Sequence, residues 1–260
     1  MLKRSIISLA LATGLAMTGT AWAQTPKSGG TLNFAVVAGP PTYDLHAANS
    51  FSVIHYLAPH YSGLLTFDWQ NYPALEGDVA DSWTVSDDEL TYTFKLKPGI
   101  TFHDGTAMTS ADVAASYERL RNPPEGVVSV RVSQFSDIES VETPDDLTVV
   151  FNMGRANSSM MMVFASPWNA IYSAAKLAED PKFPEKNVLG TGPFKFVEHV
   201  AGARWVGDKN DDYFMEGRPY LDGFVASQIA GKALTNAIQG KQVMTEFRGI
   251  APPQKKQLAD

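Results

Sequence analysis

The stretch TFKLKPGITFHDGTAMTSADV, residues 93–113, carries several signals of local structure and one apparent signal of chemistry. Its first residues alternate between polar and apolar and end at Pro98-Gly99, which predicts a β-strand closed by a turn. Asp104-Gly105 predicts a second turn, because glycine adopts a positive φ without steric cost. The adjacent His103 raises the question of a catalytic or metal site, but this setting favours a partly exposed residue at the end of a short strand.

The end of the same stretch predicts the start of a helix. Thr109 and Asp112 have the spacing of a capping box, in which the two side chains satisfy backbone N–H groups of the first turn. Apolar side chains then recur every three to four residues, which predicts an amphipathic helix over residues 111–120. The stretch is therefore interpreted as scaffold, consisting of strand, turn, short strand, turn and capped helix.

Predicted strands and helices are interspersed along the remaining chain. This mixed order indicates an α/β protein of the mixed α+β kind, and no internal repeat is visible. Strands are predicted by apolar runs or two-residue periodicity, and helices by near-helical spacing. We expect strands at 31–37, 83–85, 91–96, 147–153, 190–200, 203–208 and 220–229, and helices at 51–58, 111–120 and 170–178.

Composition narrows the class of function. The 260 residues include 28 acidic and 21 basic residues, for a net charge of −7, and no cysteine. An acidic chain without a basic run is poorly suited to bind the phosphate backbone, so we expect no nucleic-acid partner. Without disulfides, an exported protein must rely on its core, which suits a large domain better than a small cross-linked module.

Residues 1–23 have the pattern of a signal peptide. Two basic residues precede a short apolar run, and Ala21-Trp22-Ala23 forms a small-residue cleavage site. A short membrane anchor is the alternative, but the run is shorter than a bilayer-spanning helix. We expect cleavage after Ala23, a periplasmic location and no direct membrane insertion once the signal is removed.

The usual motifs of enzymes and metal sites are missing from the sequence. It has no G-x-S-x-G elbow, no phosphate-binding loop and no H-E-x-x-H helix. Gly190-Thr191-Gly192 is followed by Pro193, which favours a tight turn over a phosphate cradle. His55 and His60 are five residues apart and do not share one helix face. We therefore expect no enzyme, no cofactor and no metal site.

Three segments together resemble the family 5 extracellular solute-binding proteins of ABC importers, which include peptide- and nickel-binding proteins. They are LEGDVADSWTVSDDELTYTFKLKPGITFHDGTAMTSADVAASYERL (75–120), GTGPFKF (190–196) and KNDDYFMEGRPYLDGF (209–224). The family has corresponding motifs in the same order. The resemblance implies a monomeric periplasmic receptor that encloses a peptide or other small solute between two lobes and delivers it to an ABC permease.

The resemblance also implies a division of the chain. The fold would be the large periplasmic-binding-protein type, whose first lobe carries an extra subdomain. The lobe-one core would comprise residues 24–60 and 165–224, with the extra subdomain at 61–164 between them. Residues 225–260 would begin a second lobe and are too few to bury a core of their own. We therefore expect an N-terminal fragment or truncated reading frame, with poor solubility and weak or absent ligand binding by itself.

Ligand contacts are assigned only through the resemblance. In peptide-binding relatives, residues shortly after a motif similar to Tyr43-Asp44-Leu45-His46 contact the ligand, which points to Asn49 and Phe51. In nickel-binding relatives, an arginine in the loop similar to ASPWNAIY contacts the chelate; Trp168 and Asn169 occupy that neighbourhood here. The absence of this arginine argues against a nickel chelate. Each of the four residues also fits an ordinary loop or core position.

Two other functions stay open at this point. One is an exported receptor or chaperone-like binder that is not coupled to transport, and the other is an exported hydrolase, for which no nucleophile–base pair is visible. Among solutes, the sequence leaves a peptide, an opine, a sugar, a metal chelate and haem undistinguished. It does predict a binding protein whose diagnostic motifs are scaffold.

Overall fold

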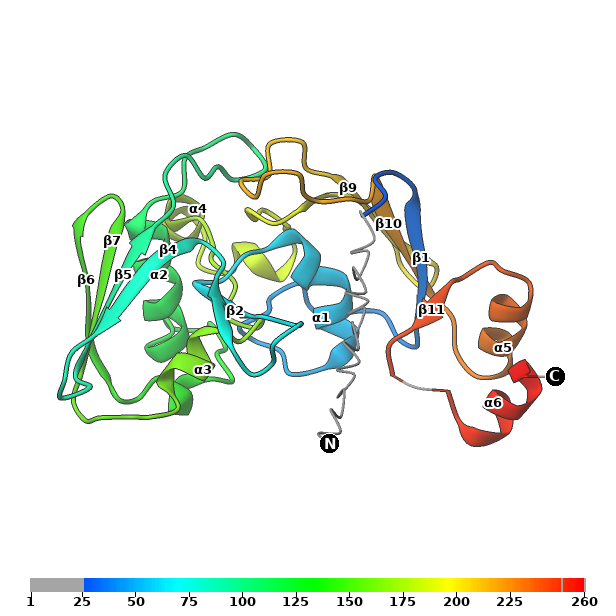
Figure 1. Cartoon of the computed structure of the whole chain (residues 1–260), viewed down its shortest axis with the longest axis horizontal. Helices are drawn as coiled ribbons and strands as arrows, with labels where there is room; N and C mark the ends of the chain where they lie inside the picture. Colours follow the sequence, from blue (N-terminus) through cyan, green and yellow to red (C-terminus); the bar gives the residue numbers. More distant parts are fainter. Residues whose placement is uncertain (1–25, 249, 260) are drawn as a thin grey trace, which may run out of the picture.

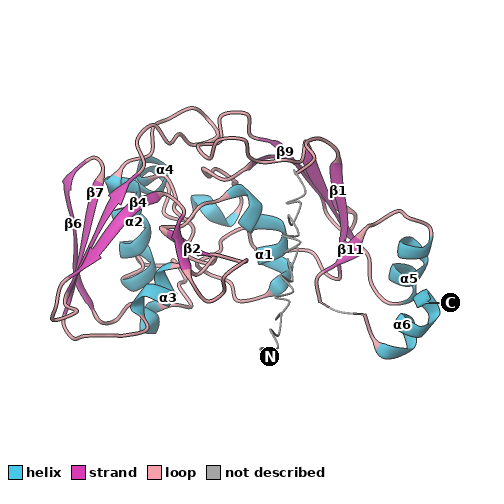
Figure 2. Cartoon of the chain, viewed as in Figure 1, coloured by secondary structure: helices cyan, strands magenta, loops and turns pink. Residues whose placement is uncertain are grey.

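The computed structural model describes residues 26–248 and 250–259, so the predicted signal peptide at 1–23 lies outside the described residues. Two β-sheets stand at opposite ends of the molecule with helix α1 (Phe51–Leu57) between them (Figures 1 and 2). Within the described ranges, no helix is both long and apolar enough to cross a bilayer. The mixed α/β class predicted from the sequence is confirmed.

A five-stranded sheet lies toward one end of the molecule, with α5 (Lys232–Gln239) and α6 (Pro252–Ala259) beyond it (Figure 1). Strand β1, next to the edge, runs parallel to β10 on one side and to the short edge strand β11 on the other, and the remaining pairs are antiparallel. The order is β11-β1-β10-β9-β8, with bounds Thr245–Glu246, Thr31–Val36, Gly223–Gln228, Arg204–Lys209 and Phe194–Val200. The sheet thus continues past residue 225, where we expected the second lobe to begin.

An antiparallel four-stranded sheet forms the other end. Its order is β4-β5-β7-β6, with bounds Ala80–Val85, Thr91–Leu96, Thr148–Met153 and Ile138–Asp145. Strands β2 (Leu65–Phe67) and β3 (Leu75–Gly77) form a separate hairpin. The alternation of apolar and polar residues in β5 buries Tyr92, Phe94 and Leu96 on one face, as its two-residue period predicts.

The helices cover these sheets and separate the interior into distinct clusters. One cluster packs the rings of Phe94, Tyr117, Phe151 and Phe164 between the four-stranded sheet and helices α2 and α3. A second lies between the five-stranded sheet and α1, around the fully buried Trp205. The other helices are α2 (Ser110–Arg121), α3 (Met160–Phe164), α4 (Ala174–Glu179), α5 (Lys232–Gln239) and α6 (Pro252–Ala259), with 3-10 turns at Ala58–His60, Val132–Gln134 and Phe183–Glu185.

The His-Asp-Gly stretch is a turn, as predicted. Gly105 has a φ of +85°, and the Asp104 carboxylate accepts hydrogen bonds from the backbone and hydroxyl of Thr106. The predicted short strand before it is only a single bridge between Thr101 and Ala107. The capping box that follows is present, with the Asp112 carboxylate accepting the Thr109 N–H at 2.7 Å.

The predicted helix at 170–178 begins late. Residues 170–172 are buried and belong to no helix or strand, and α4 starts only at Ala174, where Ser173 caps it by accepting the Lys176 N–H. Apolar spacing alone did not reveal this start, since Ile171 and Tyr172 are apolar for a different reason: they fill the two interior clusters.

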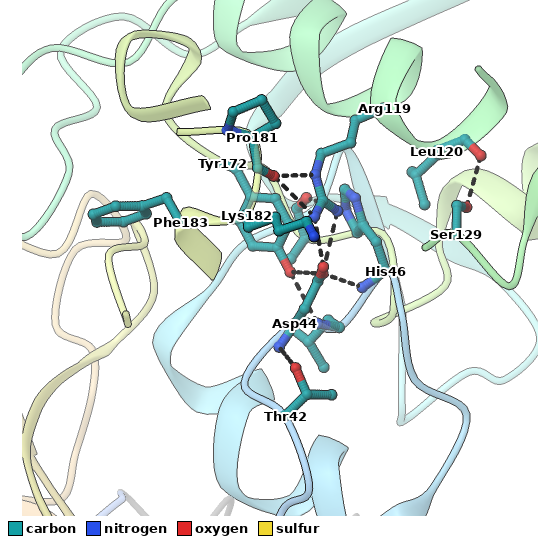
Figure 3. A network of polar contacts seen from close by, with 12 residues as sticks. Thr42, Asp44, His46, Arg119, Leu120, Ser129, Tyr172, Pro181, Lys182 and Phe183 are labelled. Carbon is teal, nitrogen blue, oxygen red and sulfur yellow. Dashed lines mark hydrogen bonds and ion pairs between the residues drawn. The ribbon is translucent and has the colours of Figure 1, made fainter. Parts of the chain in front are cut away.

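A buried ion pair connects the loop before α1 to helix α2 (Figure 3). Arg119 donates to both carboxylate oxygens of Asp44, with the shorter contact at 2.6 Å, and only 3% and 1% of the two side chains are exposed. The Tyr172 hydroxyl and the His46 backbone N–H donate to the same carboxylate. Arg119 also donates to the Pro181 carbonyl. Most polar atoms of the pair are thereby satisfied, as burial requires.

The turn Gly190-Thr191-Gly192 packs against the backbone at the end of α1. A Cβ atom on Gly190 would lie 2.0 Å from the carbonyl oxygen of His60, and one on Gly192 would lie 2.5 Å from its carbonyl carbon. Close backbone approach, rather than phosphate binding, therefore explains these glycines. His103 joins the same contact, because its Nε2–H donates to the Gly192 carbonyl at 3.0 Å.

Breaking the ion pair from one side leaves a buried charge without compensation. We expect Arg119→Met to lower the free energy of unfolding by about 3–5 kcal/mol, measured by urea denaturation. Arg155→Met removes an exposed pair with Asp137 and should cost about 1 kcal/mol or less. A double variant, Asp44→Asn with Arg119→Met, should recover part of the loss. Equal effects of the two arginine variants would contradict the role given to the buried pair.

Adding one methyl group at the tight turn provides a second test. We expect Gly190→Ala to lower the free energy of unfolding by about 1–3 kcal/mol, because the backbone must move to admit it. The matched control is Gly63→Ala, whose Cβ would meet its nearest neighbour at 3.6 Å, an ordinary contact. If thermal denaturation found Gly190→Ala as stable as Gly63→Ala, the close approach would not be a real constraint.

Candidate functional site

Exposed aromatic rings gather where α1 meets the edge strand β11. Phe51, at the first position of α1, is 58% exposed and Phe247, just after β11, is 52% exposed. His55 lies between them, with ring centroids 5.6 Å from Phe51 and 5.3 Å from Phe247. The guanidinium of Arg248 lies 6.0 Å from the Phe51 ring. We call Phe51, His55, Phe247 and Arg248 the exposed ring cluster.

The exposed ring cluster is held in place by two elements, α1 and β11, that lie far apart in the sequence. Ser50 caps α1 by accepting the Ser52 N–H, and Phe51 and His55 then share one helix face at i and i+4. On the other side, β11 pairs with β1, and Phe247 packs against Phe34 of that strand at 5.0 Å. The cluster is therefore attached to both a helix and the main sheet.

The electrostatics of the cluster favour one positive charge. Burial, followed by the nearby Arg248, lowers the pKa of His55, with Glu246 acting in the opposite direction. His55 is therefore neutral at pH 7, while the exposed Arg248 stays charged. The exposed ring cluster thus offers the faces of two phenylalanine rings for apolar groups, an imidazole that can accept or donate a hydrogen bond, and a cation suited to a carboxylate.

A second feature fixes the loop that leads into α1. Arg131 is buried and donates to the carbonyl oxygens of Leu45, His46 and Ala48 at distances of 3.0, 3.1 and 2.7 Å. Its guanidinium also lies 4.7 Å from the ring of Trp168. Arg131 comes from the segment after α2, so the same part of the chain that supplies Arg119 also holds this loop.

The four residues predicted to contact ligand occupy different environments. Asn49 and Phe51 are exposed at the start of α1, and Phe51 belongs to the exposed ring cluster. Trp168 is half-buried against Arg131, which donates to the Ala48 carbonyl of the loop that carries Asn49. Asn169 lies inside the protein, where its amide donates to the Val163 carbonyl at 2.6 Å. Their contact with a ligand stays a prediction.

Of the exposed ring cluster, sequence patterns predicted only Phe51. Phe247 and Arg248 follow a strand of two residues, too short to show any periodicity, and they meet α1 only through the pairing of β11 with β1. Arg131 was also missed, because nothing in its own segment indicates that its partners lie in residues 45–48.

The buried histidines His60 and His46 have structural roles. His60 donates from Nδ1 to the Phe194 carbonyl at 2.6 Å and accepts the Trp205 indole N–H at 2.9 Å, which fixes its tautomer. Burial lowers the pKa of His60 to about 3, and it does the same for His46. Among the described residues, no group of three or more His, Cys, Asp or Glu is placed to hold a metal ion.

Comparison with known proteins places this geometry in a family. Residues 74–260 match the family described as bacterial extracellular solute-binding proteins, family 5. The glutathione-binding protein GsiB of Escherichia coli strain 536 is 30% identical over 235 residues, which cover 88% of this chain and 43% of GsiB. The chain therefore spans less than half the length of that relative.

Solved structures show the same likeness. AgaA of Agrobacterium tumefaciens R10, in complex with agropinic acid, has a TM-score of 0.77 and 32% identity, covering 82% of this chain and 43% of AgaA. AppA of Bacillus subtilis, in complex with a nonapeptide, has a TM-score of 0.76 and 28% identity, and the match covers 84% of this chain and 44% of AppA. These matches confirm the periplasmic-binding-protein fold, and the family consists of solute-binding proteins rather than enzymes. The chain belongs to the family 5 bacterial extracellular solute-binding proteins.

Proposed function

We propose that this chain belongs to the substrate-binding component of an ABC importer, which captures a peptide or similar small solute between two lobes and delivers it to the membrane permease. The relatives support this, since their names and complexes record glutathione, a nonapeptide and agropinic acid. The signal-peptide pattern at residues 1–23 supports a periplasmic location with cleavage after Ala23.

The exposed ring cluster is the observation that carries the proposal. Burying Phe51 and Phe247 would remove two large rings from water, so their exposure marks a surface that gains free energy when it is covered. Arg248 beside them supplies the charge complementary to a carboxylate. A solute with an anionic end and an apolar body matches this combination, and a peptide has both.

We propose that the described residues up to Arg248 belong to lobe one and that the exposed ring cluster faces the second lobe. In this division, residues 24–60 and 165–224 form the core and 61–164 the extra subdomain. The second lobe starts within 225–260, after the strands that complete the five-stranded sheet. Solute then touches both lobes only in the closed state, and its differential affinity for that state drives closure about a hinge.

Neutralising the cation of the cluster tests the proposal. In a protein carrying both lobes, we expect Arg248→Gln to weaken binding of a peptide with a free carboxyl terminus about tenfold, or about 1.4 kcal/mol, by isothermal titration calorimetry. For the same peptide with an amidated carboxyl terminus, Arg248→Gln should weaken binding much less. Arg155→Gln, which changes an exposed arginine of the extra subdomain, should leave both affinities unchanged.

Two outcomes would count against different parts of the proposal. Unchanged affinity of Arg248→Gln for both peptides would remove the exposed ring cluster from the binding site while leaving solute capture intact. Failure of the unsubstituted protein to bind any member of a panel of peptides, glutathione and opine-like acids would contradict the peptide-type solute itself.

A further inference from the structure

A cavity of about 220 Å³ opens where the chain crosses from the α1 region into the four-stranded sheet. None of the residues of the exposed ring cluster lines it. Its polar lining includes Ser62, Thr66, Asp78 and Ser166, and its other walls are mostly apolar. The apolar walls come from Ala58, Leu65, Ala165, Pro167, Ala170 and Pro193. We call it the Asp78 cavity.

Asp78 contributes a carboxylate to this cavity, and among the described residues no cation forms an ion pair with that carboxylate. Its Oδ2 accepts the Gly63 N–H at 2.8 Å. The nearest ammonium, Lys97 Nζ, instead donates to the backbone carbonyls of Gly77 and Asp78 and lies 5.6 Å from the Phe214 ring. Within residues 26–248 and 250–259, Asp78 forms no ion pair. A half-buried carboxylate in this state favours a ligand that carries positive charge.

Ser62 provides a second polar group beside the Asp78 carboxylate, which it stabilises. The side chain is only 3% exposed, and its Oγ makes no hydrogen bond of good geometry with the protein. Its backbone is firmly held, because the Ser62 carbonyl accepts the Ile171 N–H at 3.0 Å. A buried hydroxyl without a well-formed hydrogen bond costs free energy, which a ligand that hydrogen-bonds to it would recover.

We propose that the Asp78 cavity binds a small primary alkylammonium ion, with the Asp78 carboxylate and the Ser62 hydroxyl accepting its N–H groups and the apolar walls enclosing its alkyl part. A hard metal ion fits less well, because it requires more oxygen ligands than one carboxylate supplies. An anion is disfavoured because the Lys97 ammonium is already bound to the backbone carbonyls of Gly77 and Asp78. This site is independent of the solute capture proposed above.

The charge state of Asp78 makes binding depend on pH. Burial raises the pKa of Asp78 to about 7. The hydrogen bond from the Gly63 N–H, the charge of Lys97 and the Ser62 hydroxyl each lower this pKa, while the negative charge of Glu76 raises it. Tyr213 faces Asp78 from the segment after β9, and burial together with Asp78 raises its pKa, so it stays uncharged. An alkylammonium ion is charged throughout this range. Its affinity should therefore rise with pH until Asp78 is fully ionised.

Titration with ethylammonium chloride tests the proposal on this chain, with ethanol as the neutral probe. By ligand-observed NMR we expect saturable ethylammonium binding at pH 8 that weakens about tenfold at pH 6, as the ionised fraction of Asp78 falls. Asp78→Asn keeps an acceptor for the Gly63 N–H but should weaken binding at least tenfold and abolish the pH dependence. Glu76→Gln, the control, removes an exposed charge nearby and should retain both the binding and its pH dependence. Ser62→Ala should bind ethylammonium several-fold more weakly.

Several results would overturn the proposal. These are absence of saturable binding by the unsubstituted chain between pH 5 and 9, equal binding of ethanol, or equal binding by Asp78→Asn. The pH profile of the unsubstituted chain decides the question even where a variant does not fold. Affinity that is constant between pH 6 and 8 would show that Asp78 is not the group that holds the ammonium.

Discussion

The Asp44–Arg119 pair is the interaction on which the arrangement of this lobe depends. A charge removed from water must be matched inside the protein, so the irregular loop carrying Asp44 can occupy only the position that Arg119 dictates. Tyr172 and the backbone of His46 complete the match. Three segments far apart in the chain are thereby fixed relative to one another at a single carboxylate (Figure 3).

The same constraint extends to the surface where we place solute. The loop from Asp44 continues through the carbonyls held by Arg131 and ends at Ser50, which caps α1 and sets the position of Phe51. Both buried arginines come from the part of the chain that we assign to the extra subdomain. That subdomain therefore does more than enlarge the lobe, because its guanidinium groups hold the loop that presents the exposed ring cluster.

Local signals predicted the parts of the fold that local physics determines. The period of Tyr92, Phe94 and Leu96, the Asp104-Gly105 turn and the Thr109–Asp112 capping box each depend on neighbours within a few residues, and each is present. The motifs resembling family 5 belong to this scaffold, which is why they identify the family without identifying its solute. His103, which first suggested chemistry, serves to join two family turns.

What the sequence did not predict depends on contacts across long separations. Asp44 and Arg119 are 75 residues apart, and the ring of Phe51 meets Arg248 through a two-residue edge strand. Asn169 resembled a loop residue by its polarity, yet it is buried, and its amide donates to the Val163 carbonyl within α3. Polarity indicates exposure only on average, and a hydrogen bond supplied from elsewhere in the chain can reverse it.

The proposed capture of solute requires that a second lobe closes over the face that these residues present. Small-angle X-ray scattering of a protein carrying both lobes, with and without saturating peptide, measures this closure. We expect the radius of gyration to fall when peptide binds, because the lobes close around it. Saturated binding with an unchanged radius of gyration would contradict closure as the mechanism of capture.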